Sequence, residues 1–84
     1  MRYTVLWSPD AENDLAAIWQ AANDRSSVTA AGNQIDALLR QDTHLQGESR
    51  YGRLRILFIP PLAIDFEVIH DDRIARVLTV WRWQ

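Results

Sequence analysis

The sequence predicts an α+β domain in which a helical hairpin packs on an antiparallel sheet, in the order β-α-α-β-β-β. Three observations support this prediction. Two stretches with helical spacing of apolar residues follow each other in the first half, alternating apolar residues fill the second half, and turn signals separate these stretches. The 84 residues leave room for a single domain, 1–84, with one small core.

The first expected elements are a short strand and a helix. Residues 3–7 are apolar, aromatic or β-branched, which is typical of a strand. Ser8 is the predicted N-cap of the helix, because Pro9 suits the first helical position and acidic residues follow it. Helical spacing of apolar residues then predicts a helix over 9–22, with these residues on one face: Ala11, Leu15, Ile18, Trp19 and Ala22.

A second helix is expected after a polar break, with Ser26 or Ser27 as its N-cap. The helical period repeats at Val28, Ala31, Ile35, Leu38 and Leu39. Because the connection is short, the two helices are expected to pack antiparallel. Residues 41–52 have no sustained period and contain Gly47 and Gly52, which predicts a loop.

Three strands are expected in the second half of the chain. Alternating apolar residues predict strands over 53–58 and 64–69, with a break at Pro60-Pro61 and a turn at Asp71-Asp72. The run 74–83 is apolar in both alternating sets, which predicts a strand covered on both faces.

The composition excludes several kinds of chemistry. The chain has no cysteine, and all nine basic residues are arginine. Disulfides, thiolate nucleophiles and Schiff-base lysines are therefore excluded. The two histidines, His44 and His70, lie far apart, so we expect no metal site and no cofactor. We expect a cytoplasmic protein, because no apolar run approaches the roughly 20 residues of a membrane helix and the N-terminus does not resemble a signal peptide.

Charge is distributed unevenly along the chain. The formal net charge is -2, but residues 1–47 have a balance of -3 and residues 48–84 a balance of +1. Phosphate contacts dominate the affinity of proteins for nucleic acids. Any surface that binds a polyanion is therefore expected in the second half.

Several segments combine with the element order to indicate a family. They are Tyr3-x-Val5 followed by Ala11-x-x-Asp14-Leu15-x-x-Ile18-Trp19, then Gly52-Arg53-Leu54-Arg55-Ile56 leading to Pro60-Pro61-Leu62-Ala63-Ile64, then Ile64-Asp65-Phe66-Glu67-Val68, and Asp72-Arg73-Ile74-x-x-Val77-Leu78. Over nearly its whole length the chain resembles the RelE/ParE superfamily, the small bacterial toxins of type II toxin–antitoxin pairs. These are fold patterns, so the resemblance concerns the fold first.

The resemblance implies one of two activities. RelE-like members cleave messenger RNA in the ribosomal A site, whereas ParE-like members inhibit DNA gyrase and cut nothing themselves. Both are neutralised by an antitoxin encoded beside them, whose tail wraps the toxin. The expected partners are thus a cognate antitoxin and either the ribosome with its messenger RNA or DNA gyrase. A degenerate, non-catalytic module with the same fold is an alternative, and a free-standing scaffold or dimerisation domain is a third; the oligomeric state stays open.

Cleavage of RNA needs a general base, a cationic clamp for the phosphate and a general acid. Arg53 and Arg55 are candidates for the clamp, because i and i+2 share one face of a strand, and Arg82 is a further candidate. Glu48 and His70 are the candidates for base and acid. Residues expected to bind RNA or another target are Arg50, Arg76, Trp81 and Trp83.

The last strand departs from the pattern of the RNA-cleaving relatives. It has Thr79 where such toxins often carry a histidine, and the tail Trp81-Arg82-Trp83-Gln84 contains no tyrosine. The net charge of -2 is also unusual for a protein that docks on ribosomal RNA. Inhibition of gyrase needs no catalytic residues and fits these departures better.

Each candidate also has a purely structural interpretation. Arg53 and Arg55 would form ion pairs with Asp65 and Glu67 across the meander. Glu48 would be an exposed loop residue, and His70 a turn residue.

The four tryptophans also have structural interpretations. Trp7 and Trp19 follow the apolar faces of their elements and are expected in the core. Trp81 and Trp83 share a face. They either cap the core beneath the helical hairpin, which we favour because a small domain needs its large side chains inside, or form an exposed platform for a partner.

Overall fold

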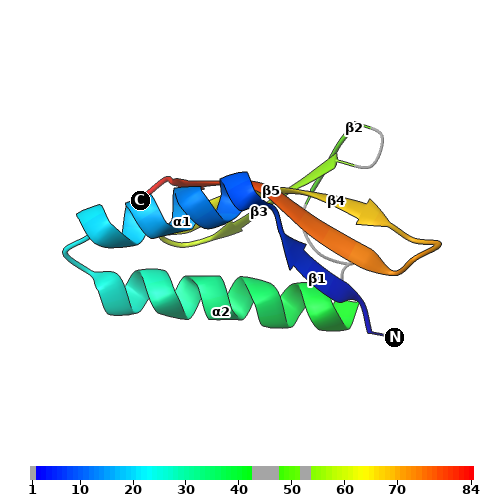
Figure 1. The fold of residues 1–84 in the computed structure, drawn as a ribbon, viewed down its shortest axis with the longest axis horizontal. Helices are drawn as coiled ribbons and strands as arrows, with labels where there is room; N and C mark the ends of the chain where they lie inside the picture. Colours follow the sequence, from blue (N-terminus) through cyan, green and yellow to red (C-terminus); the bar gives the residue numbers. More distant parts are fainter. Residues whose placement is uncertain (1, 43–47, 52–53) are drawn as a thin grey trace.

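Two helices cover one face of a five-stranded sheet (Figure 1). The structure, a computed structural model of the chain, describes residues 2–42, 48–51 and 54–84. The elements are β1 (Thr4–Trp7), α1 (Pro9–Ala21), α2 (Arg25–Asp42), β2 (Glu48–Tyr51), β3 (Leu54–Ile59), β4 (Leu62–Ile69) and β5 (Ile74–Arg82). The predicted α+β class, with a helical hairpin packed against a meander, is confirmed.

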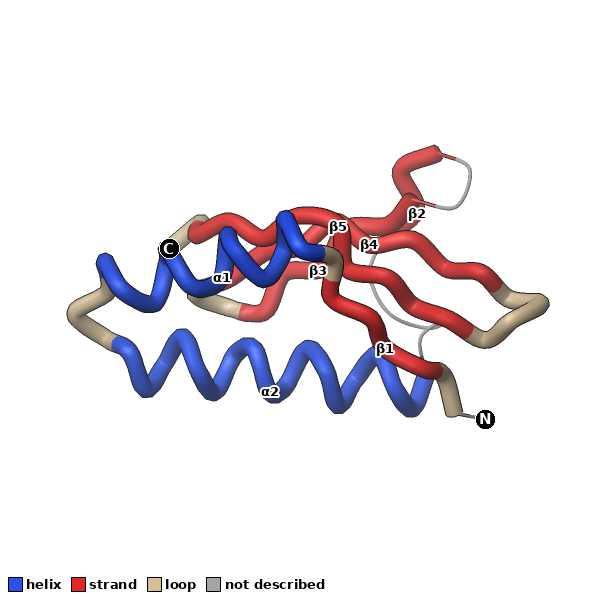
Figure 2. Tube along the Cα trace, in the orientation of Figure 1, coloured by secondary structure: helices blue, strands red, loops and turns tan. Residues whose placement is uncertain are grey.

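The strands lie in the order β1-β5-β4-β3-β2, as the tube in Figure 2 shows. Strands β2 to β5 form an antiparallel meander, and β1 adds to β5 in parallel, with Val5 opposite Ala75. The sheet is therefore mixed, and the prediction of a wholly antiparallel sheet is wrong at this edge. Strand β1 leads directly into the helical hairpin, so it positions α1 against the sheet.

The start of α1 is built as the sequence predicts. The Oγ of Ser8 accepts a hydrogen bond from the N–H of Ala11 at 3.0 Å, and Pro9 occupies the first helical position. The same hydroxyl donates to the carbonyl of Leu78 at 3.1 Å. One side chain therefore caps α1 and attaches it to β5.

The start of α2 differs from the prediction. The helix begins at Arg25, before the expected caps Ser26 and Ser27. The carbonyl of Asp24 accepts hydrogen bonds from the N–H groups of Ser27, at 3.0 Å, and Val28, at 3.2 Å. The polar break before α2 is therefore shorter than the composition suggests.

The loop predicted over 41–52 is partly wrong. Helix α2 continues to Asp42, and Glu48–Tyr51 form the edge strand β2, with Ser49 opposite Arg55 of β3. This short strand has no apolar alternation, so its pairing with β3 and not its own propensity accounts for it. Gly47 and Gly52 lie outside the described residues.

The core lies between the helices and the face of the sheet that they cover, which we call the helix side. Its largest fully buried side chains come from both layers: Val28, Ile35, Leu39, Leu62, Ile64, Phe66 and Val77. The opposite face of the sheet, the open face, has no helix over it in the described part of the chain. The expectation that 74–83 is covered on both faces is therefore wrong.

An irregularity in β5 explains its unclear pattern. Asp65 lies opposite Thr79 but Phe66 lies opposite Val77, so Leu78 is an extra residue on β5. Such a bulge changes which residues face which side of a sheet. Before it Ala75 and Val77 face the core, and after it Val80 and Arg82 are on that side.

Neither helix of the described part is long and apolar enough to cross a membrane.

Candidate functional site

Arg82 lies on the helix side at the end of β5. Its NH1 and NH2 groups donate to the two carboxylate oxygens of Asp24 at 2.8 and 2.7 Å, and its Nε donates to the carbonyl of Gln84 at 2.7 Å. The hydrogen bonds from Arg82 lower the pKa of Asp24, and those to Asp24 raise the pKa of Arg82. This guanidinium is thus engaged by the connection between α1 and α2.

Arg76 lies on the open face. Its NH1 group donates to Oε1 of Glu67 at 2.8 Å, across the β4–β5 pair. Asp65, on the same face, accepts a hydrogen bond from the hydroxyl of Thr79 at 3.2 Å. Arg76 and Arg82 therefore project from opposite faces of one strand.

Arg55 lies on the helix side near the β2 edge. The register puts it opposite Phe66, whereas Asp65 and Glu67 lie opposite Ile56 and Leu54. The expected pairing of Arg55 with Asp65 and Glu67 is wrong, because those carboxylates project from the other face.

Two other predicted site residues belong to the same edge of the sheet. Glu48 of β2 lies opposite Ile56 of β3, and Arg50 also belongs to β2. The side chains of Glu48 and Arg50 lie outside the described part. Glu48 is therefore a strand residue and not a loop residue. Arg53 also lies outside the described residues.

His70 lies in the turn between β4 and β5. Its Nδ1 is 2.9 Å from the hydroxyl of Tyr3, and the two rings meet edge to face with centroids 6.2 Å apart. Tyr3 itself is buried, whereas His70 is exposed. The histidine is held at the end of the sheet where β1 begins.

The structure does not bring the described candidates together. Arg82 lies opposite Leu62, at the start of β4, whereas His70 follows the end of that strand. At about 3.3 Å per residue, the length of β4 separates them by about 25 Å. Arg55 is opposite Phe66, four residues along β4 from Leu62, so about 13 Å along the strand separates it from Arg82. Arg82 and His70 cannot act on one phosphate.

Three aromatic side chains gather at one end of the open face. The rings of Phe58 and Trp83 meet edge to face with centroids 5.0 Å apart, and Ala63 lies between Phe58 on β3 and Trp81 on β5. Phe58 and Trp83 are each 43% exposed, while Ala63 is fully buried. The expectation that Trp81 and Trp83 cap the core beneath the hairpin is therefore wrong, since they pack on the opposite face.

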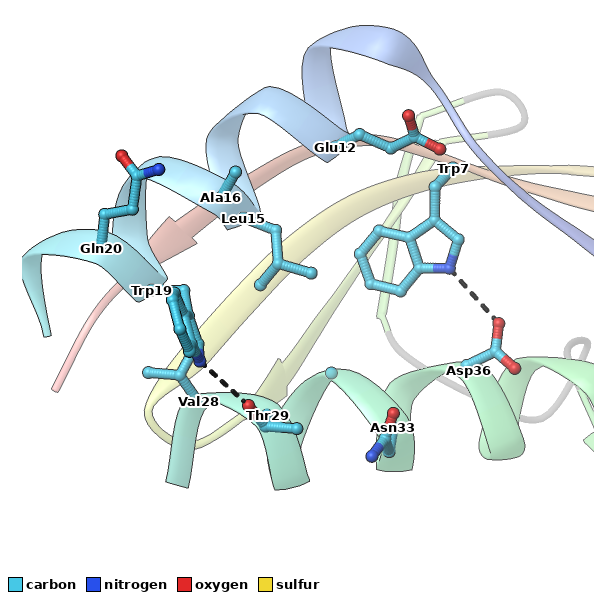
Figure 3. A pocket seen from close by; sticks show the side chains of 11 residues that line it. Trp7, Glu12, Leu15, Ala16, Trp19, Gln20, Val28, Thr29, Asn33 and Asp36 are labelled. Atoms are coloured by element: carbon cyan, nitrogen blue, oxygen red, sulfur yellow. Dashed lines mark hydrogen bonds between the residues drawn. The ribbon is translucent and has the colours of Figure 1, made fainter. Parts of the chain in front are cut away.

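A second apolar surface lies between the two helices. We call it the interhelical groove; it has a volume of about 520 Å³. Figure 3 shows its side chains, which are Trp7, Glu12, Leu15, Ala16, Trp19, Gln20, Val28, Thr29, Asn33 and Asp36, with Gly32 on α2 completing the lining. Leu15 lies in its middle, opposite Gly32, where an added Cβ would be 3.8 Å from Cδ2 of Leu15, and an indole lies toward each end.

The two indoles of the groove are fixed by hydrogen bonds. Nε1 of Trp7 donates to Asp36 at 3.3 Å, and Nε1 of Trp19 donates to the hydroxyl of Thr29 at 3.2 Å. Arg25 stacks on Trp19, with its guanidinium carbon 4.6 Å from the ring centroid. Trp19 is 42% exposed, so its expected core position is wrong, whereas Trp7 is half-buried and packs against the core.

Sequence reasoning missed this groove. One available signal was the second face of α1, where Glu12, Ala16 and Gln20 follow each other at intervals of four residues. A small residue beside an aromatic one on a helix face leaves a hollow that a neighbouring helix does not fill. Gly32, in the middle of α2, has the same effect from the other side.

The formal charge of the helical segment is opposite in sign to that of the rest of the chain. The helical segment 9–42 contains six carboxylates and two arginines, a formal balance of -4, while the rest of the chain has a balance of +2. Helix α1 carries three acids and no basic residue. Within the described residues, no cluster of three or more possible ligands could hold a metal ion.

Comparisons with known proteins were made by sequence and by structure. No protein-family model matches the chain, and no curated protein matches it by sequence. Solved structures do match. A chain of the RelBE2 toxin–antitoxin complex from Mycobacterium tuberculosis is similar with a TM-score of 0.80 and 14% identity, over 99% of this chain and 100% of that one.

Two further structures extend the comparison. The chromosomal ParDE system of P. aeruginosa matches with a TM-score of 0.72 and 19% identity, over 99% of this chain and 98% of that one. The isolated E. coli RelE toxin matches with a TM-score of 0.67 and 9% identity, over 98% of this chain and 85% of that one. Identities this low establish architecture and not activity. From its first strand to its last, the chain has the fold of the RelE/ParE toxins.

Proposed function

We propose that this chain is the toxin of a type II toxin–antitoxin pair and that its antitoxin binds in the interhelical groove. The groove carries the proposal, because it is apolar, open to solvent and flanked by Trp19, which is 42% exposed. Contiguous apolar patches on small proteins commonly mark partner sites. The full-length similarity to chains from toxin–antitoxin complexes supports an antitoxin as that partner. The expected cytoplasmic location is part of this proposal.

The positions of the described charged residues favour a toxin that acts by binding. Arg76 and Arg82 are both paired with carboxylates and lie on opposite faces, and His70 is about 25 Å from Arg82. An enzyme that cleaves RNA needs its clamp, base and acid within contact of one phosphate. Inhibition of DNA gyrase has no such requirement, so gyrase is the target we favour.

Ribosome-dependent RNA cleavage is the second candidate, and one observation supports it. Arg55 lies opposite Ser49 of β2, the strand that carries Glu48 and Arg50, and Arg53 precedes β3. A phosphate clamp and a carboxylate base would both come from this edge of the sheet. The basic balance of the chain outside the helices is consistent with an anionic target on the sheet layer.

The first experiment tests the toxin assignment. The intact chain is induced in a bacterium that lacks the neighbouring genes, with and without each adjacent small gene on a second plasmid. Growth arrest that one neighbour reverses is expected. Undisturbed growth, combined with the absence of a neighbour whose product co-purifies with this chain, would contradict the proposal and favour a scaffold or dimerisation domain.

The second experiment separates the mechanisms. Messenger RNA cut sites on ribosomes are mapped in the arrested cells, and supercoiling by DNA gyrase is measured with the purified chain. The double variant Arg53→Ala, Arg55→Ala is compared with Arg2→Ala, which removes one exposed arginine just before β1, a strand that β5 and β4 separate from β3. Arrest and gyrase inhibition that survive the double change are expected. Cut messenger RNA that disappears only in the double variant would favour the nuclease, and a chain that binds the antitoxin but does neither would be a degenerate module.

A further inference from the structure

The interhelical groove has a length and a chemistry that restrict what can fill it. Along α1 it extends from Glu12 to Gln20, which at 1.5 Å per residue is about 12 Å. Two turns of a partner helix cover this distance and present apolar residues at i, i+4 and i+7. The middle of the groove suits such a stripe, because Leu15 lies there opposite Gly32, where an added Cβ would be 3.8 Å from Cδ2 of Leu15.

The two ends of the groove are chemically different. Glu12 and Asp36 line the end at Trp7, whereas Gln20 and Thr29 line the end at Trp19 (Figure 3). A partner segment therefore meets carboxylates at one end only.

The two carboxylates at the acidic end are not equally available. Asp36 already accepts hydrogen bonds from Arg40, at 2.7 Å, and from Trp7. Glu12 is exposed and has no ion-pair partner among the residues that the structure describes. Helix α1 also contains no basic residue that would neutralise it. The N-terminal end of the α1 dipole favours this carboxylate, but no described side chain pairs with its charge, and it lies beside an indole that can also attract a cation.

We infer that the segment of the partner that fills the groove is a basic amphipathic helix, which places an arginine or lysine beside Glu12 and Trp7. The identity of that partner as an antitoxin rests on the proposed function, but the chemistry of the segment rests on the groove. An acidic segment would bring like charge to a layer with a balance of -4. A second copy of this chain, docked through the same helical layer, would do the same.

Two labelled peptides of about 14 residues test the inference. Both are capped helices of alanine with leucine at i, i+4 and i+7; the flanking positions carry arginine in one and glutamate in the other. Binding to the purified chain is followed by fluorescence anisotropy. The arginine peptide is expected to bind about three- to tenfold more tightly at low salt, and the difference is expected to shrink at high salt because exposed ion pairs are screened.

Two charge variants locate the preference. Glu12→Gln is expected to remove most of the difference between the peptides. Asp10→Asn, a change of the same charge on an exposed residue of the same helix outside the groove lining, is expected to leave most of it. Equal loss in both variants would mean that the peptides sense only the net charge of the layer, and this would overturn the inference.

A third variant tests occupancy of the groove. Gly32→Leu fills its middle and is expected to weaken both peptides, with Gly32→Ala as the milder control and circular dichroism as the check on folding. Equal or tighter binding of the glutamate peptide, or no binding of either, overturns the inference. Growth arrest reversed by a neighbouring gene would then leave the toxin proposal standing. Conversely, a chain that selects the arginine peptide but arrests no growth has the inferred groove without the proposed function.

Discussion

The carboxylate of Asp14 on α1 accepts a hydrogen bond from the backbone N–H of Val80 on β5, at 3.2 Å. Strand β1 pairs with β5 only as far as Trp7, opposite Val77, so beyond that point β5 has no neighbouring strand on this side. Ser8 bonds to the carbonyl of Leu78 in the same stretch. Side chains at the start of α1 thus satisfy backbone groups that would otherwise form an open sheet edge.

Removing this acceptor is expected to destabilise the fold. Asp14→Ala leaves the N–H of Val80, a residue only 4% exposed, without its partner, and should lower the free energy of unfolding by about 1–3 kcal/mol. Asp14→Asn keeps an acceptor oxygen and should cost less. Urea unfolding at neutral pH measures both. Asp10→Ala, on the exposed first turn, controls for the helix dipole, and a loss as large as that of Asp14→Ala would show that the bond to Val80 is unimportant.

The pair formed by Asp24 and Arg82 should make stability depend on pH in acid. Because the hydrogen bonds from Arg82 lower the pKa of Asp24 below its ordinary value of 3.8, the folded state binds that proton less readily than the unfolded state. The contribution of the pair is therefore present above pH 3.8 and lost as the pH falls below it. The difference in urea midpoint between the wild type and Asp24→Asn should accordingly be larger at pH 7 than at pH 3.

A double-mutant cycle with Arg82→Gln isolates this pair from other titrating groups. In the Arg82→Gln background, Asp24→Asn should change the midpoint little at either pH. A difference between wild type and Asp24→Asn that stays constant down to pH 3 would contradict the assigned cause of the pKa shift.

Gly32 offers a stabilising change. It lies inside α2, and an added Cβ would meet only Cδ2 of Leu15, at 3.8 Å, an ordinary van der Waals contact. Alanine costs less backbone entropy than glycine in a helix, so Gly32→Ala should raise the free energy of unfolding by up to about 1 kcal/mol. Thermal and urea unfolding test this. A lower stability would mean that the groove has less room than the distance to Leu15 indicates.

Periodic segments were the part of the fold that the sequence predicted well. Ser8 and Pro9 start α1 as local chemistry requires, and the apolar spacing of both helices identifies their buried faces. Strand β2 escaped prediction because it depends on β3, since nothing in Glu48–Tyr51 favours a strand alone. The bulge at Leu78 could not be predicted for a related reason, because an extra residue is recognised only when the register of two paired strands is known.

The candidate site was less predictable, because it depends on which face each strand presents. Counting residues cannot reveal that Arg76 and Arg82 project from opposite faces when a bulge lies between them. The spacing of Trp19 agrees with the apolar face of α1. The sheet and α2 together do not cover the whole of that face, so the indole stays 42% exposed. Pairing across layers, such as Asp24 with Arg82 over 58 positions, has no local signal.

The contact of Phe58 with Trp83 yields the last prediction. Both rings lie on the open face, where the backbone N–H of Trp83 also bonds to the carbonyl of Pro61 at 3.1 Å and so holds the end of the chain against the β3–β4 turn. If the edge-to-face contact stabilises the fold, a double-mutant cycle of Phe58→Leu and Trp83→Leu should show a coupling free energy of about 0.5–1.5 kcal/mol, measured by urea unfolding. If the cluster instead serves only a target, the single variants should retain full stability and the coupling should vanish, while binding of that target falls. Because Ala63, which lies between Phe58 and Trp81 in the sheet, is fully buried, we expect the coupling to be present.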